Sequence, residues 1–218
     1  MVILDSRCDP LQPLALLRLG AMILFLAGTP SVVLAGEQAD QIQLWIQDPY
    51  TSDSVLTSVP EPDTSLWNAK RINDYEASLA VSTAPPLGIM TIPKINVQVP
   101  IYNGTDELLL NRGVGRIKGM AKMDEAGNLG IAGHRDGIFR GLKEIQAGDE
   151  IEVQTTRGVQ MYTVSSITIV PKSDISVLDP STDKILTLVT CYPFYFIGNA
   201  PKRYIVKADA GQFIPGEP

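Results

Sequence analysis

Three side chains that are far apart along the chain have the types needed for acyl transfer. The chain has one histidine, His134, and two cysteines, Cys8 and Cys191, and Arg203 follows the second cysteine. A thiolate attacks a carbonyl carbon, an imidazole moves protons, and a fixed positive charge stabilises an oxyanion. Because the chain offers so few alternatives, we take Cys191 as the candidate nucleophile, His134 as the candidate acid–base and Arg203 as the candidate oxyanion stabiliser.

Each of these residues stands at the end of a predicted strand. Cys191 ends the apolar run 185–191, His134 ends the strand-like run 129–134, and Arg203 opens the run that continues through 204–208. A strand end holds its last side chain rigidly and still presents it to a cleft. Since side chains alternate between the faces of a strand, only one of Lys202 and Arg203 can face that cleft.

The remainder of the folded part also shows short strands separated by turn residues. Further strands are expected at residues 89–92, 97–99, 151–153, 159–164 and 167–170. Short helical turns are expected at residues 105–110 and 137–145. Seven or eight short strands with few helices are typical of an all-β sandwich or barrel.

The N-terminus has the character of a membrane or export segment. Residues 19–35 carry no charge, and Arg7 and Arg18 precede them. A helix of that length spans roughly 26 Å, just short of a bilayer core. The positive-inside bias then leaves residues 1–18 in the cytoplasm and the rest outside. We favour an uncleaved signal anchor, and a cleaved signal peptide is the alternative because the run ends in small residues.

Beyond the apolar run the chain divides into four further segments. The expected segments are a linker at 36–62, a helix at 63–84 capped by Asp63, a barrel at 85–210 and a tail at 211–218. In this topology Cys8 and Cys191 lie on opposite sides of the membrane and cannot pair. Cys191 is then an unpaired thiol in an export compartment.

Composition supports a folded domain and argues against one class of partner. Hydrophobic residues make up 44% of the chain and charged residues 19%, which suits a chain with a core. The formal net charge is -6, and the sequence pI is about 4.8. A nucleic-acid binder needs a basic face for phosphates, so we expect no nucleic-acid partner.

Three motifs in this order resemble those of the sortase family. They are residues 133–136 (Gly-His-Arg-Asp), 187–191 (Thr-Leu-Val-Thr-Cys) and 203–206 (Arg-Tyr-Ile-Val). The likeness runs from about residue 87 to residue 210. It is strongest to the class D branch, because an Asp-Thr-Ser-Leu-Trp helix start precedes the barrel and a short loop joins Cys191 to Arg203.

The resemblance implies a closed eight-stranded barrel and a membrane-anchored cysteine transpeptidase. Its substrates would be exported proteins with a C-terminal sorting signal of the Leu-Pro-x-Thr-Gly type. Cys191 would attack the Thr–Gly carbonyl and form a thioester, and His134 would move protons for the leaving and incoming amines. Arg203 would stabilise the oxyanion, and Thr190 would help to shape the oxyanion and substrate site.

The amine acceptor implied by the resemblance is a cell-wall peptide or a pilin lysine, and attachment to the cell surface would be the outcome. Some family members bind calcium in the loop before the histidine strand, but here that loop offers only Asp124 and Glu125. We interpret these two as a solvated turn. One histidine without a Cys-x-x-Cys spacing also disfavours zinc, so we expect no metal and no cofactor.

Two other functions remain open from the residues. One is a non-enzymatic surface module that uses the barrel for binding. The other is a different cell-wall cysteine enzyme, such as an L,D-transpeptidase, whose histidine lies close to its cysteine in sequence. The wide separation of His134 from Cys191 disfavours the second.

Overall fold

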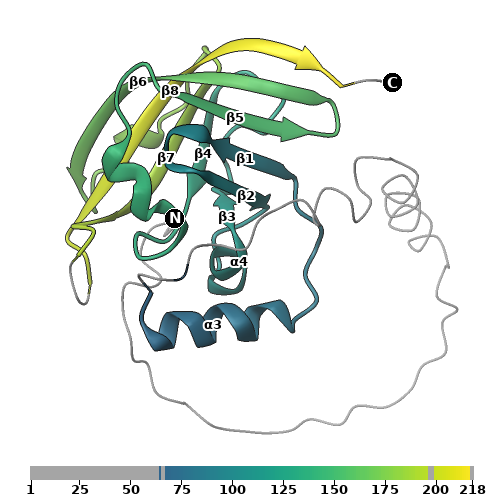
Figure 1. Ribbon diagram of the computed structural model, residues 1–218. Coiled ribbons are helices and arrows are strands. Elements are labelled where there is room, and N and C mark those ends of the chain that lie inside the picture. The colour runs from purple at the N-terminus through teal and green to yellow at the C-terminus, as the bar shows by residue number, and fades with distance from the viewer. Residues whose placement is uncertain (1–63, 65–66, 196–198, 217–218) are drawn as a thin grey trace, which may run out of the picture.

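The computed structural model describes residues 64, 67–195 and 199–216 (Figure 1). The predicted membrane segment at 19–35 and the linker at 36–62 lie outside these residues, as does Cys8. Among the helices of the described part, none has the length and apolar character required to cross a bilayer.

Eight strands close into one barrel, as expected. Their order around the barrel is β1-β2-β3-β4-β7-β8-β6-β5, and β5 pairs with β1 to complete it. The strands are β1 (Gly88–Ile92), β2 (Val97–Tyr102), β3 (Val114–Arg116), β4 (Asn128–Ala132), β5 (Glu150–Thr155), β6 (Gly158–Pro171), β7 (Ile185–Tyr192) and β8 (Lys202–Pro215). In Figure 1, β6 and β8 run beside each other across the upper side of the barrel.

Burial differs between the peripheral and the central strands. In β5, Ile151 and Val153 are buried while Glu150 is exposed, as alternation predicts for a strand with one wet face. In β4 all five residues are buried, and this strand runs parallel to β7. A strand buried on both faces needs apolar cover outside the barrel as well as inside it.

That outer cover is a small second cluster of apolar side chains. Ile117, Ala132, Val189 and Ile205 form it, and Leu178 from the loop between β6 and β7 packs against it. The inner core is larger and includes Leu129, Ile131, Leu186, Leu188 and Val206. Strand β4 ends at Ala132, two residues before His134, and not at His134 as predicted. This strand and the two that carry Cys191 and Arg203 have packed cores on both sides.

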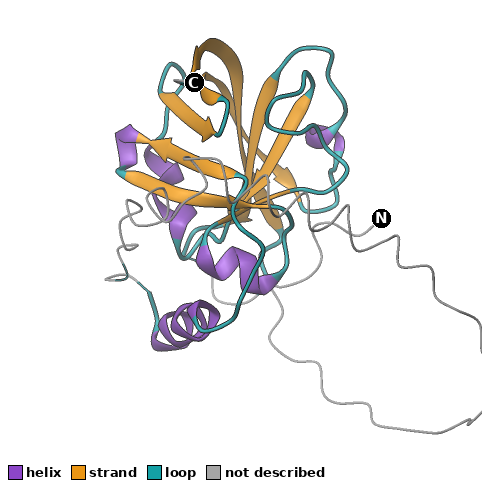
Figure 2. Cartoon of the chain, turned by 90° about the vertical axis from the view of Figure 1, so that its right-hand side faces the viewer, coloured by secondary structure: helices purple, strands orange, loops and turns teal. Residues whose placement is uncertain are grey.

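The helices lie outside the barrel. The α-helices are α3 (Ala69–Leu79) and α4 (Glu107–Arg112), and the 3-10 helices are η1 (Pro93–Ile95), η2 (Ile138–Glu144) and η3 (Ser176–Leu178). Two of these, α4 and η2, fall where the sequence predicts short helical turns. Figure 1 places α3 and α4 below the barrel, and Figure 2 shows helices below the strands from the side.

The first helix is shorter than the predicted 63–84. Helix α3 begins at Ala69, because the side chain of Asn68 accepts a hydrogen bond from the Arg71 amide at 2.8 Å and so caps it there. Before the cap, the Trp67 amide donates to the Thr64 carbonyl in a turn. The helix ends at Leu79.

Two strand assignments also differ from the sequence-based expectation. Residues 211–215 were expected in a tail but belong to β8, where Ile214 pairs with Val159 and Pro215 with Gly158. The long strand β6 supplies this partner edge, which no local pattern in the tail reveals. Strand β3 was not expected at all, since three residues are too few for a periodicity.

Tyr162 in β6 leads to a prediction about alkaline stability. Its side chain is fully buried, and its hydroxyl makes no hydrogen bond within the described residues. Burial raises the pKa of Tyr162 to about 12. An unfolded tyrosine ionises near pH 10. Between about pH 10 and pH 12 the unfolded state loses this proton first, so stability falls by roughly 2–3 kcal/mol.

The variant Tyr162→Phe should abolish this alkaline loss. It also removes a buried hydroxyl without a partner, so the free energy of unfolding at pH 7 should rise or stay constant within about 1 kcal/mol. Urea unfolding followed from pH 7 to pH 12 measures both effects. The exposed Tyr195→Phe is the control and should keep the loss. A Tyr162→Phe profile parallel to that of the unmodified chain would contradict the prediction.

Candidate active site

Cys191 and Arg203 are direct partners across two neighbouring strands. Strands β7 and β8 are antiparallel, and their register pairs Cys191 with Arg203. Residues directly opposite in an antiparallel pair project to the same face, with Cβ atoms about 4.5–5.5 Å apart. The thiol and the guanidinium therefore leave the barrel wall side by side.

His134 follows the other neighbour of β7. Strands β4 and β7 are parallel, Ala132 pairs with Val189, and the Gly133 amide donates to the Val189 carbonyl at 3.2 Å. Two residues beyond this pair, the chains reach His134 and Cys191. The imidazole thus emerges beside the thiol, on the side away from Arg203. Both side chains are partly exposed: the His134 side chain is 18% exposed, and Cys191 is intermediate.

Thr190 ties the end of β7 to the backbone in front of His134. Its hydroxyl donates to the Gly133 carbonyl at 2.8 Å, and the residue is 2% exposed. The hydroxyl hydrogen is therefore used in a hydrogen bond within the barrel wall. Strand alternation also turns the Thr190 side chain to the face opposite that of Cys191. In this arrangement the residue fixes the spacing of the two strands. Its expected part in the oxyanion site stays a prediction.

The guanidinium of Arg203 is buried and held by the chain around it. The residue is 5% exposed, and its Nη1 donates to the carbonyls of Ala200 at 3.1 Å and Lys202 at 3.0 Å. Lys202 is exposed, as expected from strand alternation. A guanidinium keeps its charge at every relevant pH and so supplies a fixed cation beside Cys191.

Helix α4 brings an acidic side chain to the imidazole. Glu107, the first residue of α4, places Oε1 3.5 Å from Nε2 of His134. The sequence predicted only a short helical turn at residues 105–110. The contact with His134 was missed, because it depends on where the loop between β2 and β3 lies against the end of β4.

Helix α3 supports both α4 and the loop that follows His134. Arg71 is 5% exposed, its guanidinium lies 4.9 Å from the centre of the Trp67 ring, and it donates to the side chain of Asn111 in α4. Gly137, in the loop after His134, packs so closely that an added Cβ would lie 3.2 Å from both Trp67 and Arg71.

Charge around Arg71 compensates for its burial. Burial lowers the pKa of Arg71, and the nearby carboxylates of Asp136, Glu107 and Asp74 act in the opposite direction. Of these, Glu107 contacts His134, and Asp136 lies two residues after His134 in the chain. The buried guanidinium is therefore part of the electrostatic surroundings of the site.

The loop after Cys191 packs against η2, the helix that follows His134. Tyr195 is 66% exposed, accepts a hydrogen bond from Lys143 Nζ at 2.6 Å and lies 5.0 Å below the guanidinium of Arg140. The hydrogen bond from Lys143 lowers the pKa of Tyr195. These contacts join η2 to the segment between β7 and β8.

The loop before β4 shows no cluster suited to a metal. Within the described residues, no three His, Cys, Asp or Glu side chains come close enough to hold an ion. Asp124 pairs with Arg157, and Glu125 pairs with Lys122 at 3.0 Å. Each carboxylate in this loop already faces a cation.

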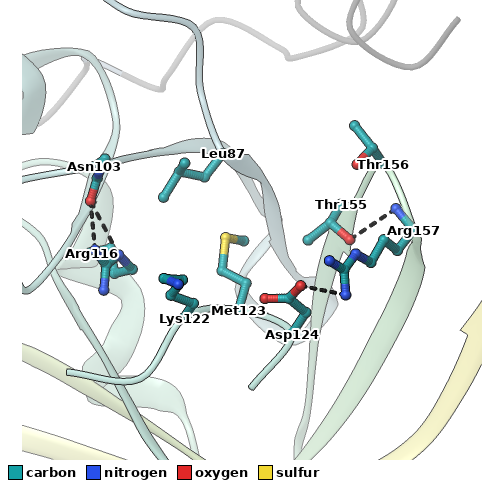
Figure 3. A pocket seen from close by; sticks show the side chains of 9 residues that line it. All are labelled: Leu87, Asn103, Arg116, Lys122, Met123, Asp124, Thr155, Thr156 and Arg157. Atoms are coloured by element: carbon teal, nitrogen blue, oxygen red, sulfur yellow. Dashed lines mark hydrogen bonds and ion pairs between the residues drawn. The ribbon is translucent and has the colours of Figure 1, made fainter. Parts of the chain in front are cut away.

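A cavity of about 300 Å³ lies beside that loop (Figure 3). Strand β4 starts after this loop and ends before His134, so the cavity is at the opposite end of the barrel. Arg116 donates to Asn103, and Arg157 pairs with Asp124, as the dashed lines in Figure 3 mark. Both arginines that line the cavity thus have partners within its lining. The cavity is separate from the thiol site.

Comparisons with known proteins agree on one family. A model described as "Sortase domain" matches residues 90–210. The chain is 42% identical over 148 residues to "Sortase D" of Bacillus subtilis, covering 67% of this chain and 75% of that protein.

Solved structures show the same likeness. A Clostridium perfringens Sortase D5 transpeptidase aligns with a TM-score of 0.55 and 26% identity, covering 74% of this chain and 100% of that one. Sortase E1 from Streptomyces coelicolor, solved with a tripeptide in its active site, aligns with a TM-score of 0.55 and 31% identity. That alignment covers 61% of this chain and 94% of the Streptomyces chain.

The hydrogen bond from Thr190 to Gly133 predicts a local effect of Thr190→Val. Valine keeps the shape but leaves the Gly133 carbonyl without its donor, which costs about 1–3 kcal/mol of stability. The end of β4 should then open more often, and the Gly133 amide should exchange its hydrogen about tenfold faster or more. Amide hydrogen exchange with urea unfolding measures both.

Thr187→Val is the matched control for this variant. Thr187 lies in the same strand, is fully buried, and donates to Asn128 Oδ1 at 2.7 Å. Loss of this hydroxyl should lower the free energy of unfolding to a similar extent. The Gly133 amide should then exchange its hydrogen faster only by the amount that the lower global stability explains. Equal exchange at Gly133 in both variants would show that Thr190 does not hold this strand end.

Proposed function

The chain belongs to the sortase family and is a cysteine transpeptidase, and we propose that its substrates are exported proteins with a C-terminal sorting signal of the Leu-Pro-x-Thr-Gly type. The observation that carries the proposal is the register that pairs Cys191 with Arg203 and brings His134 to the other side of the thiol. Both of the earlier alternatives, a non-enzymatic module and an L,D-transpeptidase, are disfavoured by family membership.

In the first half of the proposed reaction, the Cys191 thiolate attacks the carbonyl carbon of the Thr–Gly bond. The carbonyl oxygen becomes an oxyanion, and the fixed charge of Arg203 stabilises it. As the tetrahedral intermediate collapses, the C–N bond breaks and His134 donates a proton to the leaving amine of glycine. The products are a thioester on Cys191 and a free C-terminal fragment.

The second half reverses these roles. An incoming amine attacks the thioester carbonyl, and His134 accepts its proton. The C–S bond breaks, an amide forms, and the thiolate of Cys191 is restored. One histidine that alternates between proton donor and acceptor is sufficient for both halves.

The acceptor and the location follow from the same premise. We propose that the acceptor is an amine of a cell-wall peptide or of a pilin lysine, and that the reaction attaches proteins to the cell surface. The uncharged run at 19–35 supports a single-pass anchor with the catalytic barrel outside the membrane. In that arrangement the thiol site lies on the side of the membrane to which its substrates are exported.

Turnover of a sorting-signal peptide by the full chain tests the proposal. Cys191→Ala removes the nucleophile and should abolish both cleavage and transfer to an added amine. His134→Ala should lower kcat by about 10²–10⁴, the range expected for loss of general acid–base catalysis. Mass spectrometry of the products distinguishes transfer from hydrolysis.

Cys8→Ala is the matched control, because it removes the other cysteine of the chain. It should retain full turnover. Unfolding curves of each variant exclude loss of the fold as the cause. Normal turnover by folded Cys191→Ala would eliminate the proposed mechanism.

A further inference from the structure

The imidazole of His134 has a defined partner on one of its two nitrogens. Nε2 is buried and makes no hydrogen bond within the described residues, and Oε1 of Glu107 lies 3.5 Å from it. The side chains are 18% and 32% exposed. At this depth a charge interacts more strongly with its neighbour than it would in open water. The ring therefore presents Nε2 to a carboxylate and leaves Nδ1 directed elsewhere.

Glu107 is held where it is by the packing of its helix. Arg71 in α3 donates to the side chain of Asn111 and to the Leu110 carbonyl, the latter at 3.4 Å. At the far end of α4, Arg112 donates to the Val81 carbonyl at 2.8 Å. Contacts from α3 and from the segment after it thus fix α4 against the barrel, so the carboxylate meets the imidazole from a rigid element.

Two cationic side chains of α3 interact electrostatically with Glu107. Arg71 is buried and interacts electrostatically with Glu107, and Lys70 in the same helix does so as well. An ionised carboxylate only accepts hydrogen bonds. A neutral imidazole that faces it through Nε2 therefore carries its hydrogen on Nε2 and its lone pair on Nδ1.

We propose that Glu107 is a positioning residue that holds His134 through Nε2 and so reserves Nδ1 for proton exchange at Cys191. This inference rests on the proposed function, because it assigns a proton-transfer atom within that reaction. Nδ1 accepts the proton of the incoming amine and returns one to the leaving amine, while Nε2–H stays directed at Glu107. A partner on the second nitrogen commonly fixes the tautomer and orientation of a functional histidine.

The full chain offers an unambiguous measurement, because His134 is the sole histidine. With histidine-selective ¹⁵N labelling in detergent micelles, long-range ¹H–¹⁵N spectra report which nitrogen of the neutral ring carries the hydrogen. The expected result for the unmodified chain is hydrogen on Nε2. In Glu107→Gln the carboxamide can donate to a bare Nε2, so the spectrum should move toward hydrogen on Nδ1.

The same variant should lose turnover through kcat. Glu107→Gln is expected to lower kcat on a sorting-signal peptide at least about tenfold. Its KM should stay within about twofold, because the lost interaction is made with the imidazole and not with the substrate. Glu107→Asp keeps the carboxylate and should retain hydrogen on Nε2 and recover part of kcat.

Glu144→Gln is the matched control. It makes the same change of charge on η2, where Glu144 lies 3.8 Å from Lys143, and should alter neither the tautomer nor kcat. An unchanged spectrum in Glu107→Gln, or a changed spectrum with unchanged kcat, would overturn the proposal. So would a fall in kcat without a change in the spectrum. Undiminished turnover by His134→Ala would instead overturn the proposed function, and the spectra do not depend on turnover.

Discussion

The register between β4, β7 and β8 decides which side chains meet at the open end of the barrel. Strand side chains alternate, so a slip of one residue in β7 would turn Cys191 to the opposite face and bring Thr190 into its place. The pairings of Cys191 with Arg203 and of Val189 with Ala132 fix this register on both sides of β7. Every functional conclusion drawn from the site depends on it.

The packing of the central strands is what makes a slip costly. Leu186 and Leu188 are fully buried in the inner core, and Val189 is buried in the outer cluster. Exposing one such side chain costs about 1.5–3 kcal/mol, and a slip would expose several at once. Buried polar contacts add specificity, because the hydroxyls of Thr187 and Thr190 both reach β4 or the residue just beyond it. These contacts therefore also hold Gly133, the residue directly before His134.

Sequence patterns were sufficient for the parts of this protein that depend on residue type and alternation. A single histidine and one cysteine beyond the N-terminal segment left little choice of candidates, and alternation allowed only one of Lys202 and Arg203 to face the site. Sequence patterns do not show which elements lie next to each other in the folded protein. Strand β3 and the end of β8 exist because a partner edge is available, and Glu107 meets His134 only because α3 presses α4 against the barrel. The catalytic roles of Cys191, His134 and Arg203 stay proposals that this geometry supports.

The central claim is that an imidazole and a guanidinium flank one thiol at the end of three strands. The most direct test is a crystal structure of the full chain with Cys191 linked covalently to a sorting-signal peptide analogue. The account predicts the imidazole of His134 on one side of the linked carbonyl and the guanidinium of Arg203 on the other. A complex in which the peptide lies away from either group, or in which Cys191 turns to the opposite face of β7, would contradict it.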